Sequence, residues 1–267
     1  MKSKGPELGS LSSRFFAYAQ LKKLDIIRTG EIAPILNITG PQERDLFRRL
    51  SRSGWILRLK RGVYLVPSRI PAGGKYSPGV ALILQKFMEE KQGKYQICGP
   101  AAFYFYDLDD QAPNITYLYN NRISGKRSIG NLGFQFIKVA DERLGAVKTI
   151  RAREDVEMIY SSKARTLMDA VYDWSRFNSL PRGYDWIKRE IKNEPELEFE
   201  LIEVAAKYGN MATIRRIGYL LDSYLQNSKM TNQLQGQLNA TSSLIPWVPG
   251  QPSKGAINYK WGIIVNE

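Results

Sequence analysis

The sequence predicts an α+β fold, with a small basic unit at the N-terminus and a larger C-terminal domain of mixed α/β structure that ends in a helical bundle. Three observations predict it. Apolar residues recur at helical spacing over the first 52 residues and again over 163–236. Short aromatic and β-branched runs fill 95–139. Between the two regions, 67–79 holds three prolines and three glycines, a composition typical of a boundary.

The N-terminal unit is predicted to begin with three short helices. Apolar residues at helical spacing predict the first near 12–24. Thr29 is the expected N-cap of a second helix over about 28–36. For the third helix, Thr39 followed three residues later by Gln42 is a capping-box pattern, which predicts that the helix starts there.

A basic hairpin is predicted directly after the third helix. The stretch GWILRLKRGVYLVPSR, residues 54–69, has apolar residues with a period of two on either side of Arg61-Gly62. A hairpin of this length is marginally stable alone, so we expect it to pack on the three helices. Three helices followed by a basic hairpin is the order of a winged helix-turn-helix, in which the hairpin is the wing.

The larger region is predicted to open with a helix near 78–92, with Ser77 as its N-cap. The pattern then indicates strands over 95–139, although 99–107 could equally start as a helix. Helices resume at 163, and the Pro/Gly-rich tail ends in an apolar, strand-like segment. The predicted boundaries are a winged helix-turn-helix domain over 1–70, a linker over 71–79 and a C-terminal domain over 80–267.

The excess positive charge is concentrated in the first quarter of the chain. The whole sequence has 39 Lys and Arg against 26 Asp and Glu, a formal net charge of +13. Residues 1–70 hold 14 of these cations and 5 of these acids, a net +9, and the remaining 197 residues carry only +4. Such an asymmetry is typical of a module that contacts nucleic acid, and duplex DNA is the expected partner.

The third predicted helix carries the candidate base-reading residues. Arg44, Arg48 and Arg52 recur every four residues, which places them on one helix face. A helix fits the DNA major groove, where Arg binds guanine and Gln binds adenine, and residues near the helix start reach the bases. The base-reading candidates are Gln42, Arg44, Asp45 and Arg48; the backbone candidates are Arg49 and Arg52 on the helix and Arg58, Lys60 and Arg61 on the wing. A solvated basic face, or a hairpin kept soluble by charge, is the alternative.

The composition excludes several classes of catalytic site. Histidine is absent, which removes Ser-His-Asp and Cys-His catalysis and every His-containing zinc site. The single cysteine, Cys98, allows neither an intrachain disulfide nor a thiolate zinc site, and its apolar setting predicts burial. We therefore predict a non-enzymatic protein without cofactor or metal.

Two further motifs resemble a phosphate-binding loop and a Mg²⁺ site, but neither pattern is complete. SGKRS, residues 124–128, contains Gly-Lys but lacks the upstream glycine of a phosphate-binding loop, so it predicts an exposed basic turn. Asp107, Asp109 and Asp110 could hold Mg²⁺, but no Gly-Ser phosphate loop precedes them as in a nucleotidyltransferase. A polar turn between strands is the preferred interpretation of these aspartates.

The sequence shows no signal for a membrane or for export. No apolar run approaches the roughly 20 residues that a membrane-spanning helix needs. The start, residues 1–13, is polar and lacks the apolar core of a signal peptide. The expectation from the sequence is a soluble cytoplasmic protein that has no membrane partner.

Three stretches together resemble the AbiEi family. They are GWILRLKRGVYLV after a helix-turn-helix, GPAAFYFYDLDDQAP in the middle, and SSKARTLMDAVYDWSRFNSLPRGYDW followed by IRRIGYLLD. The resemblance spans roughly 12–225 and keeps the order of elements. Members are antitoxins of type IV toxin–antitoxin systems of the abortive-infection class. The resemblance implies a winged helix-turn-helix that binds inverted repeats in the operon's own promoter and represses it, and a C-terminal domain that counteracts a nucleotidyltransferase-like toxin.

The resemblance also implies where the two activities lie. DNA contacts fall on the helix at 42–52 and on the wing at 58–61, and antitoxin activity falls on 80–267. There the exposed-cation candidates are Lys163, Arg165, Arg176, Arg215 and Arg216, for which structural roles are an equal alternative. Three other functions remain open: a regulator whose C-terminal domain senses a small molecule, a metal-dependent nucleotide-acting enzyme that uses the three aspartates, and RNA binding by the basic face.

Overall fold

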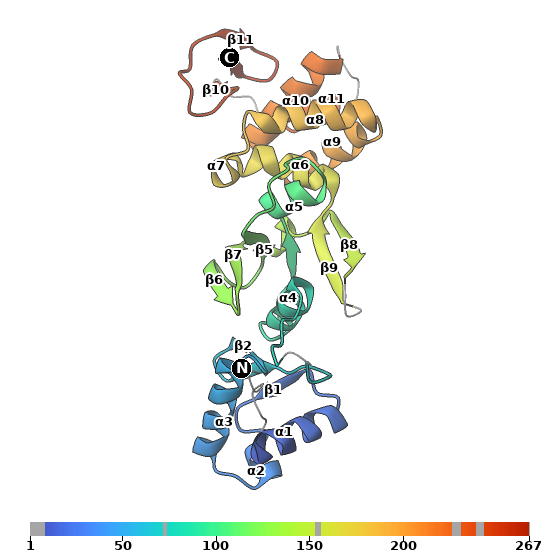
Figure 1. Cartoon of the computed structure of the whole chain (residues 1–267). Helices are drawn as coiled ribbons and strands as arrows, with labels where there is room; N and C mark the ends of the chain where they lie inside the picture. The colour runs from blue at the N-terminus through green and yellow to red at the C-terminus, as the bar shows by residue number, and fades with distance from the viewer. Residues whose placement is uncertain (1–8, 72–73, 153–155, 226–230, 239–242, 267) are drawn as a thin grey trace, which may run out of the picture. The chain divides into compact units, whose positions relative to one another are not determined.

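The computed structural model describes residues 9–71, 74–152, 156–225, 231–238 and 243–266. It confirms the α+β class: N-terminal helices with a small antiparallel sheet, a central mixed sheet, and C-terminal helices (Figure 1). The chain divides into two compact units. Unit 1 comprises Met1–Gly93, Lys126–Phe134 and Arg151–Met158, and unit 2 comprises Lys94–Gly125, Gln135–Ile150 and Ile159–Glu267.

Unit 1 contains the helices and the hairpin of a winged helix-turn-helix. Its elements are α1 (Ser10–Leu21), β1 (Ile26–Arg28), α2 (Ala33–Leu36), α3 (Gly40–Arg52), β2 (Leu57–Lys60), β3 (Val63–Leu65) and α4 (Val80–Glu89). The antiparallel hairpin of β2 and β3 is the predicted wing, and β1 pairs with β3 on its other side. Phe15, Phe16 and Phe47 lie at the centre of the core, where their rings meet edge to face.

The capping box predicted for α3 is present. The Thr39 backbone N–H donates to Gln42 Oε1 at 2.8 Å, and Thr39 Oγ1 accepts from the Gln42 N–H at 3.4 Å. These bonds satisfy groups at the helix start that would otherwise lack partners. On the inner face of α3, Leu46, Phe47 and Leu50 are buried. The cap and the apolar stripe therefore fix both the start of α3 and the face that it turns outward.

Two expected helix starts are wrong. A helix over 28–36 capped by Thr29 is not formed; the chain makes strand β1 first, and α2 starts only at Ala33. The β-branched pair Ile26 and Ile27 pairs with β3, a distant partner that local spacing does not reveal. Likewise α4 starts at Val80 with Gly79 as its N-cap, so Ser77 does not cap it.

Helix α4 follows the predicted linker at 71–79 and clusters with the N-terminal elements in unit 1. Lys86 on α4 forms an ion pair with Asp25, with 2.6 Å between Nζ and Oδ2. At the end of the helix, Glu90 pairs with Lys60 of β2 and with Arg28 of β1. These ion pairs connect α4 to the sheet of the winged helix-turn-helix. The domain boundaries at 70 and 80 stay a prediction.

The central sheet has the strand order β6-β7-β5-β4-β9-β8. Its strands are β4 (Tyr95–Ile97), β5 (Ile115–Asn120), β6 (Gly125–Ile129), β7 (Leu132–Lys138), β8 (Val147–Arg151) and β9 (Glu157–Ser161). Strand β4 runs antiparallel to β5 and parallel to β9, so the sheet is mixed. The stretch 99–107, left open between strand and helix, forms α5 (Pro100–Phe105), and a 3-10 turn covers Asp141–Arg143.

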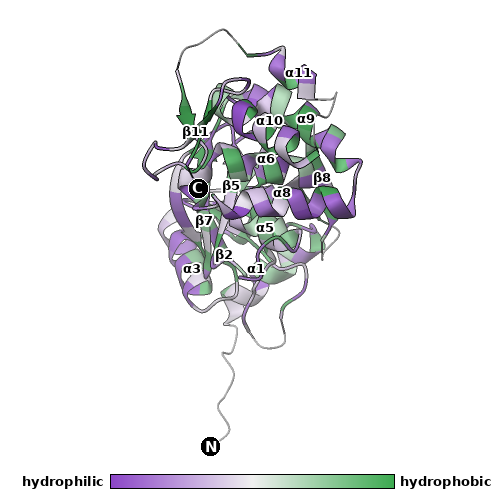
Figure 2. Ribbon diagram, turned by 90° about the horizontal axis from the view of Figure 1, so that it is seen from above, coloured by the Kyte–Doolittle hydropathy of each residue, from purple (hydrophilic) through white to green (hydrophobic). Residues whose placement is uncertain are grey.

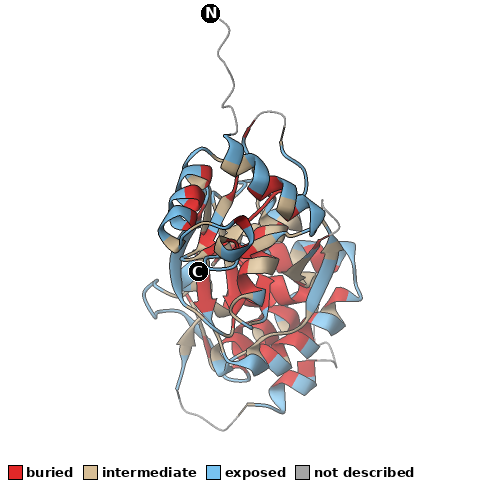
Figure 3. Ribbon diagram, turned by 90° about the horizontal axis from the view of Figure 1, so that it is seen from below, coloured by how far each residue is buried: buried red, intermediate tan, exposed pale blue. Residues whose placement is uncertain are grey.

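The C-terminal helices form the predicted bundle. They are α6 (Lys163–Tyr172), α7 (Trp174–Phe177), α8 (Arg182–Asn193), α9 (Leu197–Tyr208), α10 (Met211–Leu225) and α11 (Thr231–Gln235). Apolar stretches lie on α6 and α10, and the buried residues gather between the helices (Figures 2 and 3). The tail adds a small sheet of β10 (Ile245–Pro246), β11 (Ala256–Asn258) and β12 (Ile263–Val265), which confirms its strand-like end. In the described part of the chain, every helix is too short or too polar to cross a membrane.

Candidate nucleic-acid interface

The outer face of α3 and the wing enclose a concave surface in unit 1, with a volume of about 590 Å³. We call it the arginine groove. The described residues that line it are Thr29, Arg44, Asp45, Arg48, Ser51, Arg52, Arg58, Arg61, Gly62 and Tyr64. Half of these ten residues are arginines, and one is acidic. The groove thus brings together most of the DNA-contacting residues predicted from the sequence.

Three arginines reach the groove from α3. Arg44, Arg48 and Arg52 are exposed and lie four residues apart, on the side of the helix away from the apolar stripe. Asp45 forms an ion pair with Arg48, with 2.7 Å between Oδ1 and Nη2, and both side chains are more than half exposed. Such an exposed pair contributes about 1 kcal/mol or less, so a phosphate or a base can compete for Arg48.

The wing supplies Arg58 from β2 and Arg61 from its turn. Gly62 has a φ of +75°, the left-handed region that the tight turn requires and that glycine adopts readily. The Gly62 carbonyl accepts from the Thr29 N–H at 2.9 Å, so the end of β1 holds the turn. Tyr64 of β3, the cross-strand partner of Arg58, packs on Phe47 of α3 with 5.0 Å between ring centroids. The wing is therefore fixed against the helix that it faces.

Glu43 is a positioning residue that the sequence analysis did not single out. It lies on α3 but is fully buried. Its Oε2 accepts from the Gly30 N–H at 2.6 Å, and its Oε1 accepts from the N–H groups of Ile32 at 2.8 Å and Ala33 at 3.0 Å. One carboxylate thus caps α2 and sets its position against α3. The signal in the sequence is an acid one helical turn before the buried residue Leu46.

Glu43→Gln is expected to lower the free energy of unfolding by about 1–3 kcal/mol, because the new amide NH₂ would face backbone donors and leave at least one unsatisfied. Urea unfolding followed by circular dichroism measures the change. Glu89→Gln is the matched control: Glu89 is half exposed and pairs with Lys86 on the surface, so its loss is expected to change stability by about 0.5 kcal/mol or less. Equal stabilities of the two variants would contradict the role given to Glu43.

Three predicted DNA contacts lie outside the arginine groove. Gln42 uses its amide oxygen in the capping box. Arg49 is exposed on α3 but does not line the groove. Lys60 donates to Glu90 Oε2 at 3.0 Å and to the Glu90 carbonyl at 3.3 Å. Burial alone would raise the pKa of Glu90, but hydrogen bonds from Lys60 and Arg28 outweigh it and hold that pKa below its usual value.

Two comparisons with known proteins show what this chain is similar to. Residues 16–67, which include α2, α3 and the wing, match the family model described as "Transcriptional regulator, AbiEi antitoxin". This part of the chain is therefore similar to AbiEi antitoxins that regulate transcription. The chain is also similar in fold to the crystal structure of the Rv2827c protein from Mycobacterium tuberculosis, with a TM-score of 0.60, 13% identity, and coverage of 98% of this chain and 94% of that one. Among curated proteins, none matches this sequence.

In the C-terminal region, the expectation of exposed cations is wrong for Arg165. Its side chain is fully buried in unit 2, where Nε donates to both carboxylate oxygens of Asp169 at 2.9 and 3.0 Å. Its two terminal nitrogens donate to the carbonyls of Gly145 at 3.2 Å and Arg143 at 3.0 Å. The planar guanidinium suits such a buried site because it donates in several fixed directions.

The same expectation is wrong for Arg215 and Arg216, each with 6% of its surface exposed. Their guanidinium groups donate to the carbonyls of Ser243 and Pro246, so they hold the tail against α10. Of the remaining candidates, Lys163 forms ion pairs with Glu190 and Glu194, and the side chain of Arg176 is 45% exposed. The structural alternative therefore fits Arg165, Arg215 and Arg216, and Arg176 is the most exposed of the five.

The aspartates 107, 109 and 110 lie in the turn after α5. Asp109 accepts from the Gln111 N–H and pairs with Arg182 at 3.2 Å, which accounts for its carboxylate. Throughout the described ranges, no three His, Cys, Asp or Glu side chains come together to hold a metal ion. Cys98 is buried, which raises its pKa well above the usual value. SGKRS is exposed and basic as predicted, but it lies mostly on strand β6 rather than in a turn.

Proposed function

We propose that the protein is a DNA-binding antitoxin that represses its own promoter, and that it acts without enzymatic chemistry. The observation that carries the proposal is the arginine groove, which lies between α3 and the wing of a domain from a family of transcriptional regulators. Five guanidinium groups around one concave surface suit a polyanion. An exposed helix beside them matches the width of the DNA major groove.

The arginines divide into two roles by their place in the groove. Arg44 and Arg48 lie on the second and third turns of α3, nearer its start than Arg52, so we assign base reading to them, with Asp45 beside them as an acceptor for cytosine. Arg52 at the helix end and the two wing arginines bind backbone phosphates. Gln42 is left out of the reading set, because an adenine contact would need the amide oxygen that caps α3.

Duplex DNA fits this surface better than duplex RNA. The major groove of A-form RNA is deep and narrow, so an inserted helix cannot read its bases, whereas B-form DNA admits a helix. Competition between DNA and RNA duplexes of the same sequence measures the difference. Equal competition by the two duplexes would favour the RNA-binding alternative.

Autorepression is tested with a reporter gene behind the upstream region of the protein's own gene. Wild-type protein supplied in trans is expected to lower reporter output, because the bound protein occupies the promoter. The Arg44→Ala/Arg48→Ala variant is expected to leave the output high at the same protein level. High output with wild-type protein would contradict autorepression.

We extend the proposal to a toxin partner. The larger C-terminal domain is proposed to counteract a nucleotidyltransferase-like toxin encoded beside it, because the family of the N-terminal domain is described as an antitoxin family and residues 16–67 leave most of the chain for a second task. Expression of the neighbouring gene alone is expected to arrest growth, and co-expression of this protein to restore it. A harmless neighbouring gene would favour the alternative, a regulator that responds to a small molecule.

A further inference from the structure

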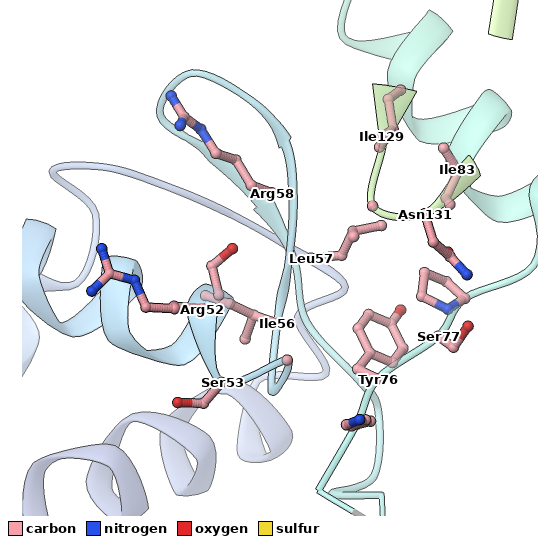
Figure 4. A pocket seen from close by; sticks show the side chains of 15 residues that line it. Arg52, Ser53, Ile56, Leu57, Arg58, Tyr76, Ser77, Ile83, Ile129 and Asn131 are labelled. Atoms are coloured by element: carbon pink, nitrogen blue, oxygen red, sulfur yellow. The ribbon is translucent and has the colours of Figure 1, made fainter. Parts of the chain in front are cut away.

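A second hollow adjoins the arginine groove in unit 1 (Figure 4). Its volume is about 410 Å³, and Ser51, Arg52 and Arg58 line both concave surfaces. In Figure 4, Arg52 and Arg58 lie on one side of the hollow, and Ile129 and Asn131 on the other. The two hollows therefore form one continuous surface that runs from the arginine groove past the end of α3 to the β6–β7 hairpin.

The second hollow is lined by cations and by apolar side chains. Arg52, Arg58 and Lys75 supply the cations, and none of the fifteen described residues that line it is acidic. Lys75 is exposed, and its Cγ lies close to Gly54: a Cβ at residue 54 would be 3.6 Å from it. The start of the lysine side chain therefore lies beside the turn that follows α3.

The tip of the β6–β7 hairpin is seated on the wing. A Cβ built on Gly130 would lie 2.8 Å from Leu57 Cδ1, and Gly130 has a φ of +62°. At this φ an L side chain is strained, and its Cβ would also displace the tip of Leu57, so the position favours glycine. Ile129, beside it, is buried in the hollow. The hairpin is thus fixed next to the proposed DNA surface.

Strand β6 is an edge strand, and it carries two adjacent exposed cations, Lys126 and Arg127. Successive side chains of a strand point to opposite faces. Arg127 therefore lies on the same face as Ile129, which lines the hollow, and the two residues are about 7 Å apart along the strand. Lys126 lies on the opposite face. Both side chains are exposed and carry one positive charge, but only Arg127 is on the strand face that borders the hollow.

We propose that the β6–β7 hairpin acts as a second wing, in which Arg127, together with Lys75, binds backbone phosphates of the DNA duplex beyond the arginine groove. This inference rests on the proposed DNA binding by α3 and the wing. The ligand is the phosphate backbone, which carries one charge per nucleotide and attracts cations whatever the base sequence. Three cations and no acid stand among the described residues that line the hollow, and the exposed Arg127 lies two residues from its lining residue Ile129; this charge suits such a backbone.

The test measures binding of the full-length protein to a duplex of its own upstream promoter region at several salt concentrations. Arg127→Ala is expected to flatten the dependence of log K on log[salt] by about 0.9, the share of one phosphate contact, and Lys75→Ala by a similar amount. Arg127→Lys keeps the charge and is expected to keep the slope. Lys126→Ala, which removes the same charge from the opposite face, is expected to bind like the wild type.

Ethylation interference locates the contacts on the DNA. With Arg127→Ala, interference is expected to disappear from phosphates at the end of the wild-type footprint and to persist at its centre. An Arg127→Ala variant with the wild-type slope and footprint, or a Lys126→Ala variant with an equal loss, would overturn the second wing and leave the proposed function standing. A wild-type protein that does not bind the promoter duplex would overturn both.

Discussion

Replacing Arg44 and Arg48 together with Ala is expected to weaken binding to promoter DNA by about two orders of magnitude or more, because each arginine–guanine pair contributes about 1–3 kcal/mol of discrimination. Fluorescence anisotropy with a labelled promoter duplex measures this loss. The affinity for a scrambled duplex is expected to fall much less. The ratio of the two affinities is thus the readout that assigns base reading to α3.

The wing variant Arg58→Ala/Arg61→Ala is expected to behave differently. Both duplexes should lose affinity alike, and the slope of log K against log[salt] should flatten by about 1.8, the share of two phosphate contacts. Lys22→Ala/Lys23→Ala removes the same charge from exposed residues of unit 1 that do not line the groove, and it serves as the control. An equal loss in the control would show that net charge, rather than the arginine groove, drives binding.

Asp169→Ala is expected to lower the free energy of unfolding by about 3–5 kcal/mol, because it leaves the buried guanidinium of Arg165 without its counter-charge. Burial raises the pKa of Asp169 to about 6, even though Arg165 and Arg143 lower it, so the carboxylate is charged at pH 7.5. Chemical unfolding at that pH measures the loss.

An exposed-pair control and a conservative variant test this expectation. Asp185→Ala breaks an exposed pair with Lys188, where 77% of the Asp185 side chain faces solvent, and is expected to change stability by about 0.5 kcal/mol or less. Asp169→Asn keeps one oxygen for Arg165 and is expected to be less destabilised than Asp169→Ala. A loss in Asp169→Ala no larger than that in Asp185→Ala would contradict a stabilising role for the buried pair.

Features with local causes could be predicted from the sequence. The start of α3 follows from Thr39 and Gln42, three residues apart, because the capping box is made by neighbours in the chain. The wing follows from alternation around Gly62, since a tight turn sets the register of its own strands. The positions of Arg44 and Arg48 in the groove follow from helical spacing alone.

Features that depend on residues distant in the sequence could not be predicted from it. Strand β1 has only three residues and depends on pairing with β3, which lies on the far side of two helices in the sequence. The burial of Arg165 depends on Asp169 and on carbonyls near residue 145, and an arginine on a helix otherwise indicates an exposed face. Glu43 caps a different helix from its own, so only the folded chain shows its partners.

Sequence-specific DNA recognition is tested by measuring how the wild-type protein binds its own upstream promoter duplex and a scrambled duplex of the same length, each over a range of salt concentrations. We expect tighter binding to the promoter, and a log K that falls steeply and linearly with log[salt] for both duplexes. Equal affinity for the two duplexes, or binding that does not change with salt, would contradict sequence-specific DNA recognition through the arginine groove.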